Sequence, residues 1–585
     1  MSNIFKAEFI RQNEDLGTVC PVFRKIFWAD KKIRKATLSV SALGFYEVHI
    51  NNNRIGKFIF APGWTSYRTR LQYQNYNVTK YLEECNTIDI AVGVGRRRHK
   101  RPDEELPFLK SDEIAVIAAL TVEYEDDTVE VITTDKTWEC MKSNILYSDI
   151  YNGEKVDFTV ECEDKFTVKE VPVDKKILIE TEGEETREMA RLDAVELITT
   201  PTGEKVIDFK QEVTGYVEWV VPARKGNTFK IQHAEFLDKD GNFYTENLRK
   251  AKCENLYICS GEEDVFKPSF SFQGFRYVRL SEFPTDNIDL DVFRAIVVHS
   301  DMKRTGRFIC GNEKINQLYH NVVWGQKGNY LDIPTDCPQR DERLGWTGDT
   351  QAFCGTAAYN AMVDGFFHKW LQDARDSQNE AGVYPDVIPT VRVVGFGGAA
   401  WSDAGIIEPY TMWKMYADTA IIEEHYESME KYMGWLEGAN MNAPNPHYGD
   451  WLAYEGTDAR LICVAYYALD CQYMEAMARA IGKLDRAEHY KATYKKVRDH
   501  FRTLYCDENG ELNPENRTQC GYLLALRIGL LDEDKRPAAV AALKQKIIDN
   551  GYKLSTGFVG SCILNEVLAE FGENNLAYSL LLQTE

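Results

Sequence analysis

The sequence predicts a multidomain β plus α protein, in which two N-terminal antiparallel β-sandwich domains precede a domain of paired α-helices. In the first 300 residues, apolar and polar residues alternate between turns rich in glycine and asparagine, which is typical of half-buried strands. After about residue 301, apolar residues recur every three or four positions over long stretches, as in amphipathic helices. We place the sandwiches at 1–180 and 181–300 and the helical domain at 301–585.

Charge and cysteine content exclude several classes of partner. A net charge of −22 disfavours binding to nucleic acid or to anionic membrane surfaces, and it says little about a neutral sugar. No apolar run reaches membrane-spanning length, and the first residues lack the pattern of a signal peptide. The fourteen cysteines include no Cys-x-x-Cys pair, which favours reduced thiols. We therefore expect a cytoplasmic protein, and the sequence leaves a homodimer open.

The two β-domains are predicted from runs with a period of two residues. In the first domain, residues 37–43 and 46–50 alternate, and 51–53 form a turn before a return strand. We interpret the basic cluster 96–101 as a solvated loop or a subunit contact, because an acidic protein is a poor ligand for nucleic acid. The predicted strands of the second domain are 206–209, 216–221, 229–235 and 273–279, with a bend at Gly215.

The helical domain is predicted from about ten segments with a period near 3.6 residues, separated by short turns that contain Gly, Pro or Asn. Antiparallel pairs in this number indicate an α/α arrangement. The predicted helices are 313–328, 351–362, 364–378, 409–416, 420–436, 458–480, 485–501, 519–530, 536–549 and 562–582.

Residues 329–351 carry the densest group of candidate catalytic side chains, in a segment whose prolines and glycines predict a loop in its first half. Crowded carboxylates raise one another's pKa while arginines keep some ionised, so one site can hold a protonated acid and a carboxylate together. A tryptophan beside acids suits a sugar ring, whose C–H face stacks on indole while its hydroxyls bond to carboxylates. The stretch contains Asp332, Asp336, Arg340, Asp341, Glu342, Arg343, Trp346 and Asp349.

Other interpretations of these patterns are weaker. A solvated acidic loop would rarely carry Trp, Leu and Ile among its charges. The Asp spacing does not fit an EF-hand and no His–Glu pair lies nearby, which disfavours a divalent-metal loop. A structural calcium near 235–240 is disfavoured because turns of this composition are common, and the glycines at 395–398 follow no clear strand. We predict no metal and no cofactor.

The run Asp-Cys-Pro-Gln-Arg-Asp-Glu-Arg-Leu-Gly-Trp-Thr-Gly-Asp at 336–349 resembles the signature of the α-L-rhamnosidases of glycoside hydrolase family 78. The resemblance implies a six-fold α/α barrel and inverting hydrolysis of terminal α-L-rhamnosides. It implies that Glu342 is the general acid, the catalytic residue. It further implies that Asp336 and Asp349 bind the rhamnose hydroxyls, that Trp346 stacks on the sugar, and that Arg340 and Asp341 shape the charge environment.

Two more stretches resemble pocket walls of that family. The first contains Trp401 and Asp403, and the second contains Asp450 and Trp451. Each fits equally well as a helix N-terminus with a polar cap and a tryptophan in the core. If 342–349 were helical, its spacing would place both carboxylates and the tryptophan roughly on one face, although two glycines weaken that helix.

The sequence departs from the family pattern in the second catalytic carboxylate, which acts as the general base. In the family, the general base is a Glu in an Ile-Trp-Glu-Arg-type segment, which the resemblance places beyond Glu585. From this and from about ten helices where a six-fold ring needs twelve, we expect a barrel that is incomplete at its C-terminus. A carbohydrate-binding protein without turnover is therefore one alternative. Another is an α/α-barrel enzyme acting on acidic sugars, which the net negative charge disfavours.

Overall fold

The computed structural model describes residues 2–584 with gaps at 99–113, 163, 222, 285–286, 391–394, 440 and 442–444. The chain divides into two compact units. The first contains Met1–Asp301 and Asn321–Leu344, and the second contains Met302–His320 and Gly345–Glu585. The acidic stretch of 329–351 is therefore divided between the units: residues 329–344 belong to the first and residues 345–351 to the second.

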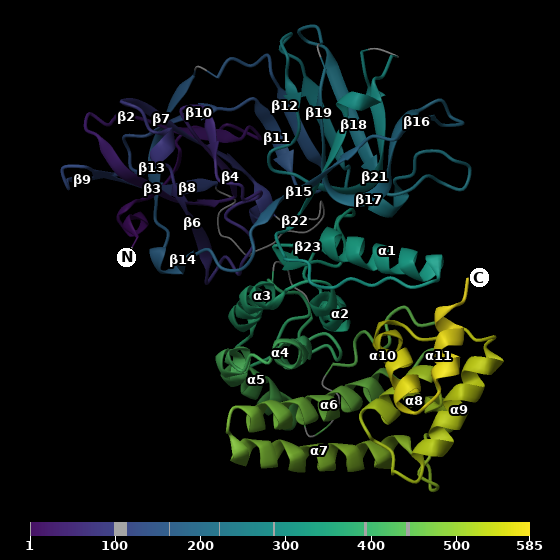
Figure 1. Ribbon diagram of the computed structural model, residues 1–585. Helices are drawn as coiled ribbons and strands as arrows, with labels where there is room; N and C mark the ends of the chain where they lie inside the picture. The colour runs from purple at the N-terminus through teal and green to yellow at the C-terminus, as the bar shows by residue number, and fades with distance from the viewer. Residues whose placement is uncertain are drawn as a thin grey trace. The chain divides into compact units, whose positions relative to one another are not determined.

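The first unit begins with a twelve-stranded sheet in which neighbouring strands are mostly antiparallel (Figure 1). Its two long central strands, Ile33–Leu43 and Ala115–Tyr124, pair antiparallel, with Ile33 opposite Tyr124 and Leu43 opposite Ala115. The first of them contains the alternating run predicted at 37–43. The strands are β1 (Phe9–Gln12), β2 (Pro21–Trp28), β3 (Ile33–Leu43), β4 (Phe45–Ile50), β5 (Asn53–Ile55), β6 (Leu71–Asn77), β7 (Cys85–Gly93), β8 (Ala115–Tyr124), β9 (Val129–Thr133), β10 (Glu139–Lys142), β13 (Lys165–Val171) and β14 (Leu178–Glu180).

The second sheet has ten strands, and β11 and β12 belong to it although they precede residue 180 in the chain. Two pairs depart from the antiparallel pattern, because β12 pairs in parallel with β19 and β14 pairs in parallel with β6. The strands are β11 (Ile145–Asp149), β12 (Gly153–Asp157), β15 (Thr186–Asp193), β16 (Glu196–Thr199), β17 (Lys205–Val220), β18 (Thr228–Ala234), β19 (Glu254–Ile258), β20 (Val265–Phe266), β21 (Gln273–Glu282) and β22 (Arg294–Ser300).

Aromatic side chains form much of the core that packs against the second sheet of the first unit. The fully buried Trp219 on β17 stacks on Phe266 with ring centroids 5.2 Å apart, and Tyr257 meets it edge-on at 5.2 Å. The same core continues to the first sheet through Phe60, whose ring lies 5.5 Å from that of Phe272. The two sheets of this unit therefore share one buried aromatic seam.

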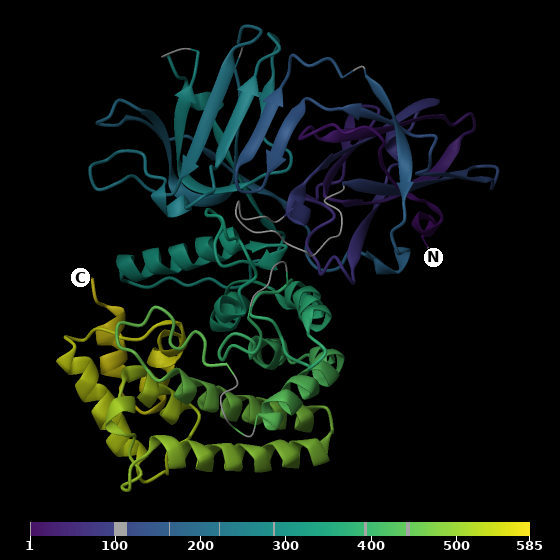
Figure 2. The same cartoon turned by 180° about the vertical axis from the view of Figure 1, so that it is seen from behind.

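The second unit is helical (Figures 1 and 2). A two-stranded piece, β23 (Tyr330–Leu331) and β24 (Ile333–Pro334), follows α1 in the first unit. The helices are α1 (Glu313–Asn329, which begins in the second unit), α2 (Thr347–Asn360), α3 (Asp364–Ser377), α4 (Ala404–Tyr416), α5 (Ala420–Gly438), α6 (Ala459–Ala480), α7 (Leu484–Tyr505), α8 (Gln519–Arg527), α9 (Arg536–Asp549), α10 (Phe558–Glu570) and α11 (Asn574–Leu581).

Alternate helices of the second unit contact one another in order. Helix α2 contacts α4, α4 contacts α6, α6 contacts α8, α8 contacts α10, and α10 contacts α2. The helices between them pack on the preceding helix of this series: α5 on α4, α7 on α6, α9 on α8 and α11 on α10. Figure 2 shows α6 and α7 side by side as an antiparallel pair. The prediction of sheet-rich domains followed by paired helices is therefore confirmed.

Several helix boundaries differ from the predictions. The segment 562–582 forms two helices, because the chain turns at Gly572 with a φ of +81°, a conformation that suits glycine. Helix α4 begins at Ala404 and contains Pro409 rather than starting there. Helix α2 begins at Thr347, so Glu342 lies in a non-helical segment, and the condition for a shared helical face at 342–349 is not met.

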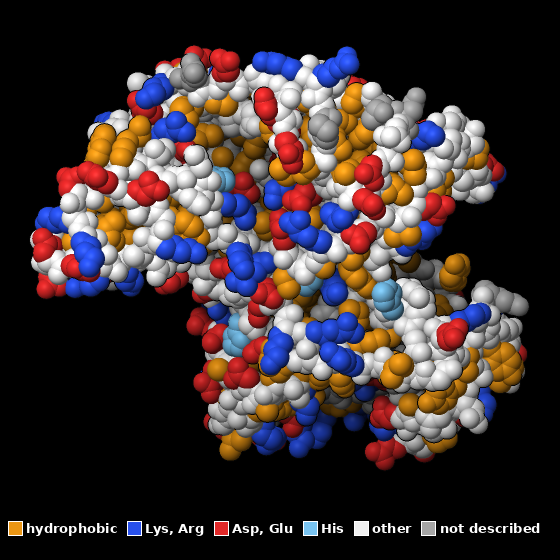
Figure 3. Space-filling view, turned by 45° about the horizontal axis from the view of Figure 1, so that its top comes forward, with side chains coloured by type: hydrophobic (Ala, Val, Ile, Leu, Met, Phe, Trp, Pro, Cys, Tyr) orange, Lys and Arg blue, Asp and Glu red, His pale blue; other side chains and the backbone are white. Residues whose placement is uncertain are grey.

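Charge and hydropathy of the folded chain agree with the composition. Among the described residues, none of the helices has the length and apolar character that crossing a membrane requires. On the face seen in Figure 3, acidic and basic side chains are interspersed rather than gathered into a patch of one sign.

Candidate active site

In the first unit, two arginines contact the carboxylate of Glu342. Arg249 Nη1 lies 2.8 Å from Glu342 Oε2, and Arg340 Nε lies 3.2 Å from the same oxygen. Only about a tenth of the Glu342 side chain is exposed, at 11%. Arg249 comes from the turn after the 3₁₀ segment Glu246–Leu248, far from Glu342 in sequence. A buried carboxyl group is thus fixed by two guanidinium groups, one local and one distant.

Arg340 also contacts Asp336, so one guanidinium group joins two carboxyl groups. Its Nη2 lies 3.2 Å from Asp336 Oδ2, while Asp336 Oδ1 accepts a hydrogen bond of 2.7 Å from the Leu344 backbone N–H. Burial raises the pKa of Asp336 to about 6, and the neighbouring charge of Glu342 adds to the effect. The two acids and Arg340 therefore form a group that retains a proton at mildly acidic pH.

The raised pKa of Asp336 has a consequence for stability. Its ordinary pKa is about 4, so the folded chain binds one more proton than the unfolded chain between pH 4 and about 6. The free energy of unfolding should therefore fall as pH rises through this window, by at most about 3 kcal/mol from this group. We expect Asp336→Asn to lack this component. Urea titrations of both proteins from pH 4 to 7 measure it, and parallel pH profiles would contradict it.

Asp341 presents a buried acceptor beside Glu342. Its Oδ1 atom makes no hydrogen bond, and its nearest cation is Arg249 Nη1 at 3.8 Å. An unpaired buried oxygen is costly, and it is satisfied when a ligand donates a hydrogen bond to it. Asp341 is therefore suited to receive a ligand hydroxyl.

Two buried side chains, one tyrosine and one arginine, fix the backbone that carries Glu342. The Tyr151 hydroxyl donates to the Glu342 carbonyl at 2.8 Å, and Arg96 Nη1 donates to the Arg343 carbonyl at 2.8 Å. Arg96 lies over the Trp64 ring, 4.1 Å from its centroid, and burial lowers its pKa to about 10. The interpretation of 96–101 as a solvated loop is therefore wrong for Arg96, while 99–101 lie outside the described residues.

In the second unit, the three tryptophans that the sequence predicts as sugar-binding residues lie around Tyr448. The ring centroid of Tyr448 lies 4.3 Å from that of Trp401, 6.0 Å from that of Trp346 and 6.3 Å from that of Trp451. Trp401 also stacks on Phe558, with the rings 2° from parallel. Trp401 is buried, Trp346 is half-buried and Trp451 is 48% exposed. This aromatic cluster can offer indole faces to an apolar ring surface.

The start of α2 packs closely against this aromatic cluster. Trp346 precedes the helix and Asp349 lies in its first turn, partly exposed. A side chain at Gly348 would lie 2.4 Å from the Trp401 ring, so only glycine allows this approach. The carbonyl of Asp386 accepts hydrogen bonds of 3.0 Å from both the N–H and the hydroxyl of Thr347. The helix start is therefore positioned by a loop that the sequence did not mark.

Asp403 lies beneath Trp401 in the helical core rather than on an open surface. One of its oxygens accepts from the Ala400 N–H at 2.6 Å and the other from the Tyr432 hydroxyl at 2.8 Å. Burial raises the pKa of Asp403. The structure thus gives Asp403 a role in holding the loop that carries Trp401.

Asp450 binds the N-terminus of a distant helix. Its Oδ2 accepts from the Gly557 N–H at 2.8 Å, and its Oδ1 accepts from the N–H groups of Val559 and Gly560 at 2.8 and 3.2 Å. These residues begin α10, whose exposed N–H groups and dipole attract a carboxylate. Asp450 therefore fixes α10, and with it Phe558 in the aromatic cluster.

Replacing Asp450 by Ala should lower the free energy of unfolding by about 2 kcal/mol, because three N–H groups lose their acceptor. Asp458→Ala is the matched control, since Asp458 caps α6 with a single hydrogen bond to the Arg460 N–H at 2.9 Å. Urea unfolding of the two variants measures the difference. A loss for Asp450→Ala no larger than that for Asp458→Ala would contradict this role.

Several functional candidates were not predicted from the sequence. Arg249, Tyr448 and Asp386 contact predicted residues but belong to no motif in the sequence. Asp386 bonds to the Gly398 N–H at 3.0 Å and to the Tyr448 hydroxyl at 2.8 Å. Its only local signal is a position between two prolines, Pro385 and Pro389. Within the described residues, no group of three or more His, Cys, Asp or Glu side chains is arranged to hold a metal ion.

Three family descriptions match consecutive parts of the chain. The bacterial α-L-rhamnosidase six-hairpin glycosidase domain matches residues 303–585, the α-L-rhamnosidase N-terminal domain matches 31–190, and the bacterial α-L-rhamnosidase concanavalin-like domain matches 198–299. A curated α-L-rhamnosidase from Streptomyces avermitilis is 35% identical over 570 residues, which are 94% of this chain and 55% of that protein. The chain thus spans about half the length of this relative.

Solved structures are similar along almost the whole chain. The crystal structure of the Streptomyces avermitilis α-L-rhamnosidase complexed with L-rhamnose has a TM-score of 0.93 and 34% identity, covering 97% of this chain and 56% of that one. The α-L-rhamnosidase of Aspergillus terreus has a TM-score of 0.94 and 31% identity, covering 100% of this chain and 71% of that one. With the three family matches, these similarities show that the chain belongs to the α-L-rhamnosidase family.

Proposed function

We propose that the whole protein hydrolyses terminal α-L-rhamnosides, with Glu342 as the acid that protonates the departing oxygen. The observation that carries the proposal is the environment of Glu342 within a member of the α-L-rhamnosidase family. Its carboxyl group is buried, contacts two arginines, and shares Arg340 with a second acid. Glycosidases depend on such a carboxyl group, whose surroundings regulate its proton.

The acid pair supplies the proton for this step. Arg340 contacts both carboxyl groups, and burial together with the neighbouring charge of Glu342 raises the pKa of Asp336 to about 6. One proton is therefore available to the pair under mildly acidic conditions. Its transfer from Glu342 to the glycosidic oxygen breaks the C–O bond and leaves Glu342 ionised, a form that Arg249 and Arg340 stabilise.

The remaining predicted residues are proposed to bind the sugar. Asp341 has an unpaired buried oxygen for a hydroxyl, and Trp346 has the aromatic face for an apolar ring surface. Asp349 is proposed as a further hydroxyl acceptor at the start of α2. We assign Asp403 and Asp450 to positioning rather than to contact with substrate, because their oxygens bind the protein itself.

The stereochemistry is proposed to be inversion. Water attacks the anomeric carbon on the face opposite the departing oxygen, and a second carboxylate takes its proton. None of the residues described above is assigned to this second role.

Hydrolysis of 4-nitrophenyl α-L-rhamnoside by the whole protein tests the proposal. We expect release of rhamnose, with the β-anomer as the first product in a proton NMR time course. Absence of rhamnose release would reject the function, and an α-anomer as the first product would reject inversion.

We also infer a reducing, cytoplasmic location. All fourteen cysteines are free, and burial raises the pKa of several, such as Cys253 to about 11, which keeps their thiols protonated. Fractionation of cells that produce the protein, with thiol labelling of each fraction, tests this. Recovery of the protein outside the cell would contradict it.

A further inference from the structure

Three carboxyl groups lie buried in the helical core of the second unit, and the steps proposed above use none of their protons. Asp403 precedes α4, Glu408 lies on α4 and Asp470 lies on α6, a helix that contacts α4. Each is at most 2% exposed. Among the described residues, no oxygen of Glu408 or Asp470 has a hydrogen-bond partner. Burial raises the pKa of Glu408, and the charge of Asp403 adds to the effect.

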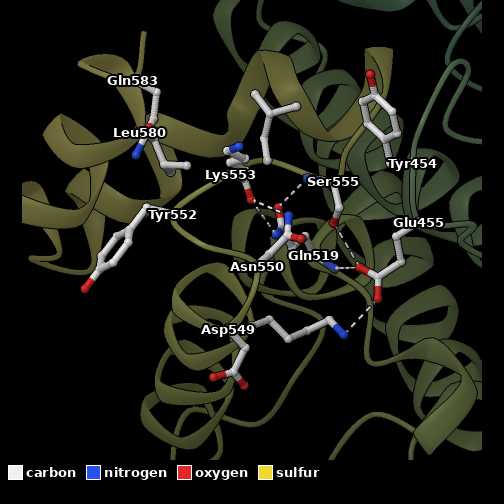
Figure 4. Close-up of a pocket in the computed structure, with 12 residues that line it drawn as sticks. Tyr454, Glu455, Gln519, Asp549, Asn550, Tyr552, Lys553, Ser555, Leu580 and Gln583 are labelled. Atoms are coloured by element: carbon white, nitrogen blue, oxygen red, sulfur yellow. Dashed lines mark hydrogen bonds and ion pairs between the residues drawn. The ribbon is translucent and has the colours of Figure 1, made fainter. Parts of the chain in front are cut away.

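A partly buried acid of the same unit shows how a protein stabilises a carboxylate. Glu455 lies in the wall of a pocket beside α8 and α9, and dashed lines in Figure 4 mark its contacts. Its oxygens lie 2.8 Å from Lys546 Nζ and accept hydrogen bonds from the Gln519 N–H at 3.0 Å and the Ser555 hydroxyl at 3.1 Å. Burial opposes its ionisation, but these contacts hold its pKa below the usual value. The two acids with unpaired oxygens have no comparable donors among the described residues.

The surroundings of Asp470 favour its protonated form. Burial and the nearby charge of Asp403 raise the pKa of Asp470 well above its ordinary value. Helices α7 and α8 also pack on α6, but among the described residues no group on them contributes to this shift. Arg375 on α3 acts on Tyr384 and not on Asp470. The groups whose own titration responds to the charge of Asp470 are Tyr384 between α3 and α4, Tyr432 on α5, and Tyr467, Cys471 and Tyr473 on α6.

Asp403 connects this group of acids to the aromatic cluster. Its two oxygens accept hydrogen bonds from the Ala400 N–H at 2.6 Å and the Tyr432 hydroxyl at 2.8 Å. Ala400 has a left-handed φ of +66°, a conformation that a residue with a side chain keeps only where contacts stabilise it. The next residue is Trp401, whose ring centroid lies 4.3 Å from that of Tyr448. The position of the Trp401 ring therefore depends on the hydrogen bonds of Asp403.

We propose that Asp470 is a positioning residue of the aromatic cluster: while it holds its proton, Asp403 keeps the loop 398–403 in place, and when it loses that proton the loop releases Trp401. Two neighbouring carboxylates in a buried site repel each other strongly. Movement of Asp403 relieves this repulsion, because Asp403 ends a loop whereas Asp470 lies within a long helix. The inference rests on the proposed function in one respect, the sugar-binding role of the cluster.

A signal from Trp401 itself tests the inference without turnover. The chain has eleven tryptophans, so the protein is labelled with 5-fluorotryptophan and Trp401→Phe identifies the fluorine resonance of Trp401. In the wild type, this resonance should shift between about pH 5 and about pH 9, the range in which buried carboxyl groups ionise. In Asp470→Asn the shift should be lost, because the amide has nearly the same shape and no charge at any pH. Circular dichroism verifies the fold of each variant.

Other acids of the same unit serve as controls. Glu455→Gln should retain the wild-type shift, because its contacts keep Glu455 ionised across this range. Loss of the shift in Glu455→Gln would overturn the inference. A shift that persists in Asp470→Asn would also overturn it and would point to Asp386, whose carboxylate accepts from the Gly398 N–H at 3.0 Å. A resonance that does not move with pH in the wild type would overturn it without any variant.

Binding of L-rhamnose separates this inference from the function on which it rests. At about pH 9, the Kd measured by calorimetry should be about tenfold higher for the wild type than for Asp470→Asn, because the wild type has lost one indole face. Equal values of Kd at this pH would overturn the inference. If L-rhamnose binds neither protein at any pH, the sugar-binding role of the cluster fails, while the pH dependence of the Trp401 resonance still decides the role of Asp470.

Discussion

Replacing Glu342 by Gln is expected to lower kcat/KM for 4-methoxyphenyl α-L-rhamnoside by about 10²–10⁴-fold, the usual contribution of general acid catalysis. Glutamine has nearly the same shape, but it has no proton to give to the departing oxygen. Its amide can still approach Arg249 and Arg340 through its carbonyl oxygen, so the fold should persist. Rhamnose release under steady-state conditions measures the loss, and the thermal unfolding midpoint verifies the fold.

A second glutamate in the same unit serves as the control. Glu254 on β19 forms an ion pair of 2.9 Å with Lys230, and among the described residues its side chain makes no hydrogen bond or ion pair with Glu342 or Asp336. Glu254→Gln should leave kcat/KM within about a factor of two, since surface ion pairs contribute little. A Glu342→Gln protein as active as Glu254→Gln would show that Glu342 has no catalytic role.

Replacing Arg343 by Met is expected to lower the free energy of unfolding of the first unit by about 4 kcal/mol. The fully buried guanidinium group donates to the carbonyls of Phe272 and Gln339 at 2.7 and 2.8 Å and to Gln273 Oε1 at 2.8 Å. Methionine fills the space but leaves these acceptors unpaired. Arg343 also has a left-handed φ of +52°, a conformation that its side-chain contacts must stabilise.

The effect of Arg343 should extend to activity, because Glu342 is its neighbour in the chain. Urea unfolding followed by tryptophan fluorescence measures the stability loss. Arg34→Met is the matched control, since Arg34 is about half exposed and pairs with Asp127 at 2.6 Å, so its loss should be much smaller than that of Arg343→Met. Arg343→Lys retains the charge without the planar fork and should be intermediate. Equal losses for Arg343→Met and Arg34→Met would contradict this account.

The order of sheets and helices could be predicted from the sequence because period and burial agree along most elements. Strand β3 was predicted from its alternation, and the paired helices from their apolar spacing. Periodicity could not place the ends of helices, because ends depend on single residues. Gly572 divides one long apolar pattern into α10 and α11, and Pro409 is accommodated inside α4.

The acidic segment of the candidate site could be predicted because its residues are consecutive. The run at 336–349 contains Asp336, Arg340 and Glu342, which the fold holds together around one guanidinium group. Arg249 could not be predicted, because it approaches Glu342 from 93 residues away and has no motif around it. The same reason explains Arg96, whose position in a basic cluster suggested solvent although it is buried under a tryptophan.

Short motifs also left the roles of individual acids undecided. Asp403 and Asp450 each precede a tryptophan-containing or helical segment, which fits a sugar wall and a helix cap alike. The structure shows that Asp450 binds the N-terminus of α10, more than a hundred residues later in the chain, rather than that of the helix that follows it. Which N–H groups a carboxylate reaches depends on tertiary packing, and local sequence does not encode it.

The leaving-group dependence of Glu342→Gln tests the central claim most directly. A 2,4-dinitrophenyl group departs without protonation, whereas a 4-methoxyphenyl group needs an acid. If Glu342 donates the proton, the variant should lose about 10²–10⁴-fold in kcat/KM on the methoxyphenyl rhamnoside and at least tenfold less on the dinitrophenyl rhamnoside. Equal losses on the two substrates would show that Glu342 supports the fold or the binding of rhamnose without acting as the acid.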